Sequence, residues 1–510
     1  MSSPTLEPPA AALAGRWQAT ILVVAIAAIC CVAISGRSLW IDEACSSMKV
    51  LPPTLGGWWQ ELSEDRSADV QMPLYMFYVW AWARVFGTSE WSLHWANAPW
   101  FAVGALAFIL AFPFGDRRRV SAACVVLLCP FTWYYLDEAR PYAMQLGASL
   151  LILVALARLE RGRELSNATK YGATGWDVAI FLFGVVVLSG SSLLGMVWAG
   201  SAMVAMLAFL SPGGTLRLVQ RHWHLWVAAT GLLLVFAGYY LWTLSLGARA
   251  SAAATTTLGS VLFIGYELLG FSGLGPGRLE LRSAGAAGLR SHLPLLALYA
   301  ATIAMLVGAV LRQDVRKGNR RYLMLALCYV VPAAFILGVG WVAHFRVLGR
   351  HFTPLLPALL LLLVSGLAAL WSHRRAWAKA VALLFCLLSL GSCLSLRFLP
   401  RHEKDNYRAA ATLAKTALGR GQLVWWSAAE VGARYYGVPL TTNFVQTGAA
   451  LLVLNPGRET LAPLPVPRIV VTSKPDIYDS QMALADYLRE QRFEPVARFT
   501  AFTIWEKGER

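Results

Sequence analysis

Long apolar runs separated by short polar stretches dominate the first 400 residues of the chain. The first run covers residues 17–34, and several later ones approach the roughly 20 residues that a helix needs to cross a bilayer. The later runs are 73–86, 96–114, 120–136, 142–159, 176–189, 193–210, 225–246, 293–311, 322–342, 352–371 and 377–396. This pattern predicts a polytopic α-helical membrane protein.

The composition supports this interpretation. Hydrophobic residues make up 57% of the 510 residues and charged residues only 14%, whereas a soluble domain carries roughly 25% charge. Disorder, a coiled coil and an ordinary soluble enzyme are therefore excluded. The net charge of +16 would suggest nucleic acid, but the basic residues lie in short loops, as orientation in a membrane requires. The eight cysteines contain no CxxC pair and indicate neither a disulfide framework nor a zinc site.

The basic loops predict the orientation. With a cytoplasmic N-terminus, most Lys and Arg clusters fall in cytoplasmic loops, and residues 401–510 lie outside the cytoplasm. The outer loops are then 37–72, 137–141 and 247–292. Run 73–86 is better suited in length to an interfacial or broken helix. We expect it not to cross, which gives about 11 spans, with 12 or 13 as alternatives. The first run lacks a clear signal-peptide cleavage site and is interpreted as a retained anchor.

Residues 1–400 thus form the predicted membrane domain, and the composition changes after Arg397. The tail predicts helices at 406–418, 430–436 and 480–491, with β-rich segments at 422–426, 468–472 and 496–505. Such an order favours a C-terminal soluble α/β layer fold. No GxGxxG motif follows a strand, so no nucleotide site is indicated.

Adjacent acids follow the first apolar run. Asp42 and Glu43 stand in the segment SLWIDEACS, where carboxylates can act as general bases or ligands. A solvated pair, or a favourable charge at a helix N-terminus, is the alternative. Trp40 and Ile41 suggest that the acidic pair lies at the membrane interface, where an ionised carboxylate is costly and is usually functional.

Two further outer segments carry polar residues beside a proline. Asp69 belongs to DVQMPLY, whose proline also suits an ordinary helix start. Glu138, Arg140 and Tyr142 belong to DEARPY. The following proline disfavours helix at Arg140, and a guanidinium at this interface is well shaped for a phosphate. Snorkelling to water is the alternative role of that arginine.

An outer basic cluster precedes the run at 352–371. Arg346, Arg350 and His351 break the positive-inside trend locally, and a lipid phosphate would explain them, with simple topological scatter as the alternative. Glu267, in the outer loop 247–292, is a weaker candidate, because an acid beside a membrane is often functional.

Taken together, these motifs resemble those of the C-type (GT-C) membrane glycosyltransferases. An acidic pair after the first span, D-x-x-x-P-L-Y, E-A-R-P-Y-A and R-x-x-x-P-x-x-P occur in one order. The nearest branch resembles the bacterial relatives of protein O-mannosyltransferases and of the lipid A aminoarabinose transferase, in glycosyltransferase family 39. The resemblance covers roughly residues 17–400. It implies a sugar donor carried on a polyprenyl phosphate and used at the outer face of the cytoplasmic membrane.

Some residues match the family's motifs and others depart from them. The resemblance implies that Asp42 is the acid of the first outer loop, with Glu43 as its neighbour. Glu138, Arg140 and Tyr142 match the second outer-loop motif. Arg350 and His351 match the later basic motif, where relatives often have Arg-Tyr. Departures occur at Gln71 and Met72, where relatives often have His-Pro, and at His94, where they often have Arg.

The expected chemistry is a single displacement with inversion. Asp42 would be the base for the acceptor hydroxyl, and Arg140 and Arg350 would stabilise the departing phosphate. A glycan, lipid or protein could be the acceptor, and no cofactor is certain, although a divalent metal is compatible with the pattern. The alternatives are a lipid-linked polysaccharide polymerase or ligase, a transporter or flippase, and a scaffold with a degenerate site. Transporters are disfavoured because the candidate residues cluster at outer loops rather than at mid-membrane.

Overall fold

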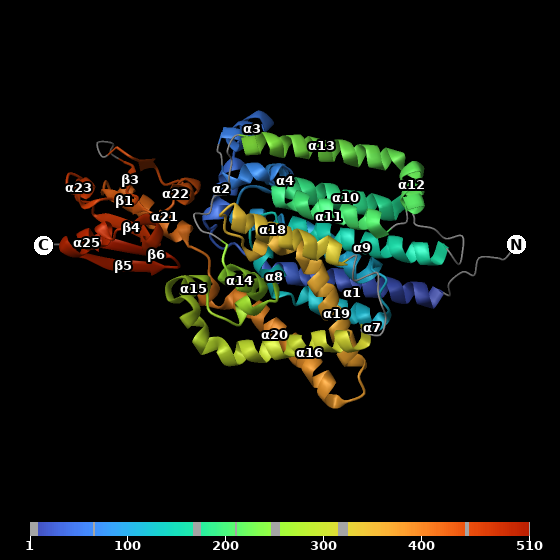
Figure 1. The fold of residues 1–510 in the computed structure, drawn as a ribbon. Helices are drawn as coiled ribbons and strands as arrows, with labels where there is room; N and C mark the ends of the chain where they lie inside the picture. Colours follow the sequence, from blue (N-terminus) through green and yellow to red (C-terminus); the bar gives the residue numbers. More distant parts are fainter. Residues whose placement is uncertain are drawn as a thin grey trace.

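The computed structural model describes residues 9–64, 67–166, 175–209, 212–245, 256–314, 325–443 and 448–508. A bundle of long helices forms one part, and a mixed sheet with its helices forms the other (Figure 1). The N-terminal end of the bundle lies opposite the sheet, which occupies the C-terminal end of the molecule. The chain is therefore a polytopic helical membrane protein with a C-terminal α/β domain.

The elements of the helical part follow one another with few long connections. They are α1 (Pro9–Ala33), α2 (Ile41–Lys49), α3 (Leu55–Glu64), η1 (Ala68–Gln71), α4 (Pro73–Phe86), α5 (Glu90–Trp95), α6 (Ala98–Leu106), η2 (Ala107–Ala111), α7 (Asp116–Leu127), α8 (Pro130–Leu136), α9 (Tyr142–Ser166), α10 (Gly175–Ser191), α11 (Leu193–Phe209), α12 (Pro212–Arg221), α13 (Trp223–Ser245), α14 (Leu258–Leu268), η3 (Phe271–Gly273), α15 (Arg278–Ala284), η4 (Gly285–His292), α16 (Leu293–Asp314), η5 (Ala326–Val330), α18 (Val331–Val342), η6 (Gly349–Leu355), α19 (Leu356–Ser372) and α20 (Ala376–Phe398).

Six helices in the described part of the chain are long and apolar enough to span a membrane, or seven if the bent pair α7 and α8 counts as one span. Five shorter apolar helices accompany them. The pair bends by 48° at Pro130, which cannot donate the next helical hydrogen bond. The predicted total of about 11 spans stays a prediction, because the shorter apolar helices have fewer than the roughly 20 residues that a span needs.

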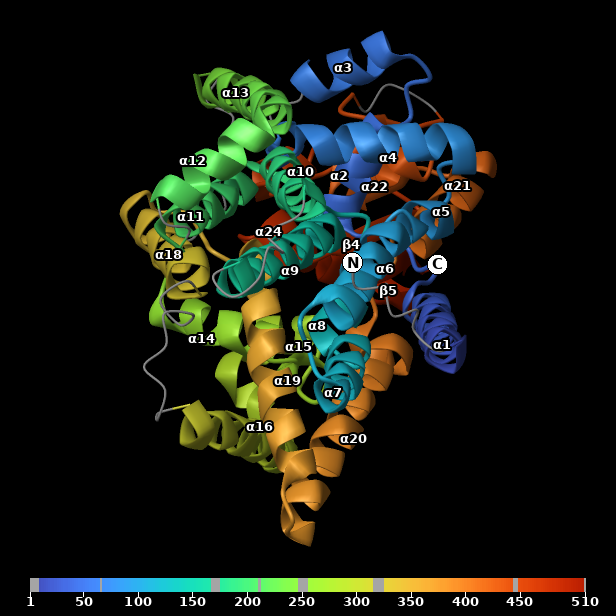
Figure 2. The ribbon, with the colours of Figure 1, turned by 90° about the vertical axis from the view of Figure 1, so that its right-hand side faces the viewer.

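Helix α4 explains how the segments 37–72 and 137–141 reach the same side of the bundle. It has 14 residues and runs lengthwise across the view of Figure 2, whereas the long helix α13 is strongly foreshortened there. In Figure 1 the reverse holds: α13 runs lengthwise across the view and α4 is foreshortened. Helix α4 therefore lies across the direction of the long helices, as its length predicted. The segments 35–49 and 137–141 consequently meet on one side of the bundle.

Glycines allow the inner helices to approach closely. A Cβ on Gly147 of α9 would lie 2.5 Å from the carbonyl oxygen of Trp100 on α6. A Cβ on Gly104 of α6 would lie 2.8 Å from Cα of Gly147. Small residues at such crossings permit backbone contact between helices in a membrane. Helix α9, whose apolar segment is 94% buried, is thus the central helix of the bundle.

The C-terminal domain is built on six strands. Its elements are η7 (Pro400–His402), α21 (Tyr407–Gly419), β1 (Val424–Ser427), α22 (Glu430–Tyr435), β2 (Leu440–Thr441), β3 (Ala450–Leu452), α23 (Arg458–Leu461), β4 (Ile469–Ser473), α24 (Pro475–Tyr478), α25 (Ala483–Glu490), β5 (Phe493–Phe499) and β6 (Phe502–Lys507). The strand order is β2-β3-β1-β4-β6-β5. Strands β1 to β4 pair in parallel, with Trp425 opposite Val470, and β6 is antiparallel to β4 and β5.

Two features of this domain differ from the sequence interpretation. The alternating stretch 496–505 is not one strand, because the chain turns back at Ala501, which has a φ of +69°, and forms the β5–β6 hairpin. The short strands β2 and β3 were not predicted, since two or three residues carry no detectable period. The remaining predicted helices and strands are present within a few residues of the expected positions.

The two parts are joined by specific polar contacts. The backbone N–H of Leu39 donates to the hydroxyl of Tyr436 at 2.8 Å, and that hydroxyl donates to Glu90 at 3.1 Å. Tyr435 donates to the carbonyl oxygen of Thr88 at 2.6 Å. The C-terminal domain therefore contacts the segment before α2 directly.

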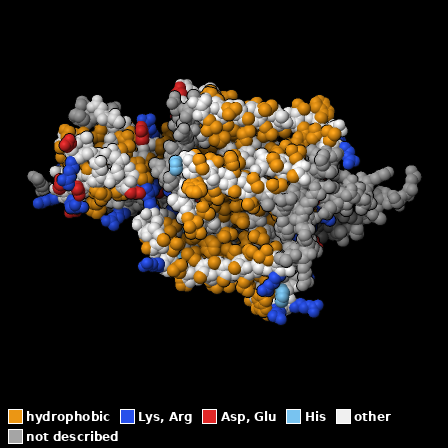
Figure 3. Space-filling view, viewed as in Figure 1, with side chains coloured by type: hydrophobic (Ala, Val, Ile, Leu, Met, Phe, Trp, Pro, Cys, Tyr) orange, Lys and Arg blue, Asp and Glu red, His pale blue; other side chains and the backbone are white. Residues whose placement is uncertain are grey.

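Surface composition separates the two parts as well. In Figure 3 hydrophobic side chains cover the face of the helical part, while charged side chains gather on the sheet domain and at the far end of the molecule. Arg374 and Arg375 lie in the turn between α19 and α20, at the end away from the sheet. This apolar band between two charged ends is the surface expected of a membrane-spanning bundle.

Candidate active site

The acidic pair Asp42-Glu43 lies in the first turn of α2. The Glu43 carboxylate reaches back and accepts a hydrogen bond from the backbone N–H of Trp40 at 3.2 Å. This contact satisfies one of the N–H groups that a helix start leaves free. Two carboxylates near the positive end of α2 also suit its dipole. The helix-start role considered from the sequence is therefore present for Glu43.

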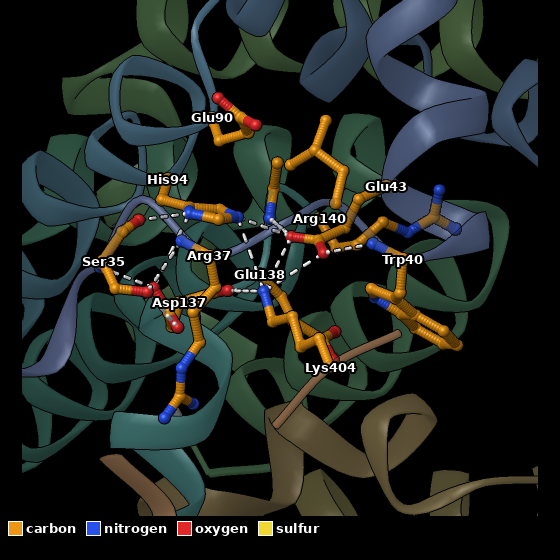
Figure 4. A network of polar contacts seen from close by, with 12 residues as sticks. Ser35, Arg37, Trp40, Glu43, Glu90, His94, Asp137, Glu138, Arg140 and Lys404 are labelled. Carbon is orange, nitrogen blue, oxygen red and sulfur yellow. Dashed lines mark hydrogen bonds and ion pairs between the residues drawn. The ribbon is translucent and has the colours of Figure 1, made fainter. Parts of the chain in front are cut away.

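Glu43 is completely buried and bound to several donors (Figure 4). Its Oε1 accepts hydrogen bonds from the backbone N–H of Ala139 at 2.7 Å and from Lys404 Nζ at 3.0 Å, and it lies 2.8 Å from Nε2 of His94. Burial raises the pKa of Glu43, but Lys404 and His94 outweigh it and lower the pKa to about 2. Glu43 thus fastens the 137–141 segment to the start of α2.

The other nitrogen of His94 completes this cluster. His94 Nδ1 lies 2.7 Å from the carbonyl oxygen of Ser35, to which it donates. Asp137 accepts hydrogen bonds from the backbone N–H and the hydroxyl of Ser35, at 2.6 and 2.9 Å. Relatives often have Arg at the position of His94. Here the imidazole of His94 connects the chain at Ser35 with Glu43 at the start of α2.

Asp69 anchors Arg140. The carboxylate of Asp69 lies 2.6 Å from Arg140 Nη1 and 2.6 Å from Lys49 Nζ, and it accepts a hydrogen bond from the hydroxyl of Ser46 at 2.8 Å. Burial raises the pKa of Asp69, but the two cations outweigh it and hold the pKa below its usual range. The Arg140 side chain is buried and is fixed in orientation by this pair.

Arg350 pairs with Asp42. Its Nη2 lies 2.9 Å from Asp42 Oδ2. The guanidinium carbon also lies 5.5 Å from the ring centre of Trp40 and 6.0 Å from that of Tyr142. The Asp42 side chain is 29% exposed, whereas that of Glu43 is not exposed. Of the acidic pair, Asp42 is therefore the carboxylate that a substrate can reach.

Arg140 and Arg350 line one cavity of about 570 Å³, a volume that includes the space open to solvent. The Nε atom of each guanidinium is buried and has no hydrogen-bond partner among the described residues. Tyr142 and His351 also line this cavity, as do Gln71 and Met72. Leu193, Leu194 and Trp198 form an apolar part of the same wall. The cavity therefore offers positive charge at one place and apolar surface at another.

Glu138 occupies a different position. It is completely buried, and neither carboxyl oxygen has a hydrogen-bond partner within the described part of the chain. Arg278 Nη1 lies 3.7 Å from Glu138 Oε1, and Arg278 Nη2 lies 3.3 Å from Glu267 Oε1. Burial raises the pKa of Glu138 above its usual range, although Arg278 opposes this effect. Glu267 also accepts a hydrogen bond from the backbone N–H of Gly349 at 3.1 Å, next to Arg350.

The structure thus gathers most of the predicted residues on one side of the bundle. Five of them lie at or beside the cavity that Arg140 and Arg350 line, namely Asp42, Arg140, Tyr142, Arg350 and His351. The remaining three predicted acids, Glu43, Asp69 and Glu138, are buried around it. Arg346 is exposed and does not line the cavity.

Three cations of the site were missed by the sequence interpretation. Lys49 follows an ordinary polar segment, and Lys404 lies 361 residues from the Glu43 that it contacts. Arg278 is the first residue of α15, and its side chain is 40% exposed. Only spatial proximity identifies these residues, although a buried acid predicts that some cation must lie near it.

A metal site was left open by the sequence. Among the described residues, no three His, Cys, Asp or Glu side chains lie close enough together to hold a metal ion.

Comparison with known proteins identifies the fold. No protein-family model and no curated protein match the sequence. The structure of ArnT from Cupriavidus metallidurans bound to undecaprenyl phosphate matches with a TM-score of 0.52 at 15% identity, over 96% of this chain and 98% of that one. The apo structure of the same protein gives a TM-score of 0.53 at 14% identity, over 97% and 98% of the two chains.

A third structure is less similar. The arabinofuranosyltransferase AftD from mycobacteria gives a TM-score of 0.40 at 14% identity, over 97% of this chain and 40% of that one. The match to ArnT covers both the helical bundle and the C-terminal domain. The chain therefore has the fold of the GT-C membrane glycosyltransferases, as its motifs predicted.

Proposed function

We propose that the protein transfers a sugar from a polyprenyl-phosphate donor to a hydroxyl group of a glycan, lipid or protein, on the outer face of the cytoplasmic membrane. The observation that carries this proposal is the cavity lined by Arg140 and Arg350. The Nε atom of each guanidinium is buried and has no hydrogen-bond partner among the described residues, and unpaired buried donors are costly. A phosphate is the ligand whose geometry satisfies both.

The rest of the cavity favours a phosphate carried on a lipid. Leu193, Leu194 and Trp198 extend its wall from α11, and this apolar surface suits the first isoprene units of a tail. Arg140 and Arg350 stand beside the ends of apolar helices, where a lipid head group meets the protein. The undecaprenyl phosphate bound to ArnT supports the same class of donor.

The reaction follows from this arrangement. The phosphate takes one side of Arg350, weakens the 2.9 Å pair with Asp42 and frees that carboxylate. The acceptor oxygen then attacks the anomeric carbon while Asp42 takes its proton. The bond between that carbon and the phosphate oxygen breaks, and its electron pair leaves with the phosphate. Arg140 and Arg350 stabilise the charge that the phosphate gains, and the sugar passes through an oxocarbenium-like state and inverts.

The remaining acids act as positioning groups in this proposal. Asp69 holds Arg140 at 2.6 Å, so that the guanidinium is already oriented before the donor arrives. Glu43 holds the backbone of Ala139, one residue from Arg140. Preorganised charges cost no reorientation at the moment of reaction, which is the main advantage of such a site.

The proposed location also rests on charge. Basic residues of α12 and of the α19–α20 turn lie at the end of the bundle opposite the sheet domain. The positive-inside rule assigns that end to the cytoplasm. The candidate site and the C-terminal domain then face the periplasm or the exterior.

Removal of the protein from its source cells tests the proposal. A polyprenyl-phosphate-linked sugar should accumulate, because its consumer is missing. The wild-type chain should restore the normal level, and Asp42→Asn should not. No accumulation of any polyprenyl-linked sugar would contradict the proposed function.

A further inference from the structure

The segment that leads from α20 into the C-terminal domain passes through the candidate active site. Lys404 lies in this segment, between η7 and α21, and its side chain is only 6% exposed. Its Nζ donates to the two carboxyl oxygens of Glu43 at 3.0 and 3.1 Å and to the carbonyl oxygen of Asp137 (Figure 4). A lysine at the entrance to the sheet domain is thus part of the cluster around Glu43.

The contacts of Lys404 connect two segments and do more than neutralise one acid. Glu43 already accepts a hydrogen bond from the backbone N–H of Ala139 at 2.7 Å. The carbonyl oxygen of Asp137 carries no net charge, so the contact with it is not an ion pair. An ammonium group has three donors, and those of Lys404 are divided between the start of α2 and the segment 137–141. Lys404 therefore bridges these two parts of the chain.

The two bridged segments carry the groups to which the proposed reaction assigns chemistry. Asp42, the proposed base, directly precedes Glu43, and Arg140 follows Asp137 by three residues. Arg140 Nη1 also donates to the backbone carbonyl oxygen of Asp42 at 3.1 Å. A shift of one segment against the other would therefore move the base relative to the phosphate-binding guanidinium. A misplacement of about 1 Å can lower the rate of a reaction by roughly 10²-fold.

The position of Lys404 depends in turn on the C-terminal domain. The next residue, Asp405, is 7% exposed and forms an ion pair with Lys474, which directly follows β4. The backbone N–H of Asn406 donates to the carbonyl oxygen of Thr500, in the turn between β5 and β6, at 3.0 Å. These contacts fix the chain immediately after Lys404 to the sheet.

We infer that Lys404 is a positioning residue for sugar transfer, and that the C-terminal domain supports the reaction by holding this residue in place. The inference rests on the proposed function and assigns a role to the domain, which the reaction described above does not use. Lys404 does not line the Arg140–Arg350 cavity, so it acts through the segments that it bridges. Asp69 holds Arg140 without Lys404, and the effect therefore falls on the rate of transfer more than on donor binding.

Two measurements on the full-length protein in detergent test this inference. The first is the dissociation constant of undecaprenyl phosphate. The second is the initial rate of transfer per molecule of protein. Membranes from source cells that lack the protein supply the accumulated polyprenyl-linked sugar together with the acceptor, and consumption of that sugar is followed after the purified protein is added.

Lys404→Arg separates a positioning role from that of a counter-ion. It keeps a positive charge beside Glu43 but replaces the ammonium by a longer, planar guanidinium. Transfer should be slower by about 10- to 100-fold, while the dissociation constant of undecaprenyl phosphate stays within about twofold. Arg would serve equally well as a counter-ion, so a wild-type rate for this variant would overturn the inference.

The contribution of the domain is tested with Lys404 left unchanged. Asp405→Asn combined with Lys474→Met removes the anchor to β4 and leaves no buried charge unpaired. This double variant should slow transfer by about 3- to 10-fold, and a wild-type rate would overturn the role of the domain. Arg408→Met is the matched control, because it removes a more exposed ion pair between the same two parts of the molecule, with Glu90 at 3.1 Å. Its rate should stay within about twofold of the wild-type rate.

The outcomes separate this inference from the proposed function. A wild-type protein that neither binds undecaprenyl phosphate nor consumes the polyprenyl-linked sugar would contradict the proposed function itself. If the wild type does both, but Lys404→Arg weakens lipid binding as much as it slows transfer, Lys404 has only a structural role and the inference is overturned. It is also overturned if Arg408→Met slows transfer as much as the double variant, since any loosening of the interface would then suffice.

Discussion

Replacing Glu43 by Gln should destabilise the protein because it removes a charge that the fold has surrounded with partners. Glu43 is fully buried, and its pKa of about 2, against an ordinary 4.5, corresponds to roughly 3 kcal/mol in favour of the charged folded form near pH 7, at about 1.4 kcal/mol per pH unit. Gln resembles the protonated carboxyl and loses this contribution. It also leaves Lys404, whose Nζ lies 3.0 Å from Glu43 Oε1, without its buried counter-charge.

The pH dependence gives the sign of the effect. The pKa of Glu43 is lower in the folded protein than in the unfolded chain. Its contribution to the free energy of unfolding is therefore complete above about pH 4.5 and is lost as the pH falls toward 2. The difference between wild type and Glu43→Gln should therefore be roughly 3 kcal/mol at pH 7 and roughly 2 kcal/mol at pH 3.5. Unfolding by SDS in mixed micelles, measured at both pH values, gives these free energies.

A surface acid provides the control for this experiment. Glu430 is 41% exposed and pairs with Arg434 one helical turn away. Glu430→Gln should change the free energy of unfolding by less than about 0.5 kcal/mol. A Glu43→Gln variant as stable as the wild type at pH 7 would refute the reasoning. A difference that does not shrink on acidification would show that lost packing, rather than lost charge, is responsible.

Three further predictions concern the base, the phosphate site and the bundle. Asp42→Asn should leave a folded protein whose sugar transfer is slower by on the order of 10²–10⁴, and near-normal transfer by this variant would show that Asp42 is not the base. Arg140→Lys should lower turnover more than donor binding, because the phosphate gains charge as the sugar leaves; wild-type kinetics would leave this arginine only a structural role in its ion pair with Asp69. Gly147→Leu should destabilise the bundle, since even a Cβ there would lie 2.5 Å from Trp100 O, and unchanged thermal unfolding in detergent would contradict the close α6–α9 contact.

The helical part was largely predictable because a bilayer imposes a simple rule. A span must be apolar over a fixed length, so the run 377–396 becomes α20 (Ala376–Phe398) and the run 142–159 lies within α9 (Tyr142–Ser166). The short run 73–86 was predicted not to cross, and α4 has those same bounds. Prolines and charges that end these runs are local signals, and they are visible in the sequence.

The site was predictable only in part, because its contacts are not local. Motifs identified Asp42, Arg140 and Arg350, but nothing near Lys404 in the sequence indicates that it pairs with Glu43. The exposed position of Arg346 was equally hidden, since it lies only four residues before Arg350. The β5–β6 hairpin was missed because Ala501 adopts a positive φ without the Gly or Asn that usually marks such a turn.

Binding of undecaprenyl phosphate tests the central claim most directly, because it asks whether the Arg140–Arg350 cavity holds a lipid phosphate. Arg350→Ala should weaken binding by about 10-fold or more, the effect of losing a hydrogen bond to a charged group. Arg346→Ala removes the same charge four residues away, at an exposed position outside the cavity, and should change the dissociation constant by less than about twofold. Equal effects of the two substitutions, or no effect of Arg350→Ala, would contradict the account.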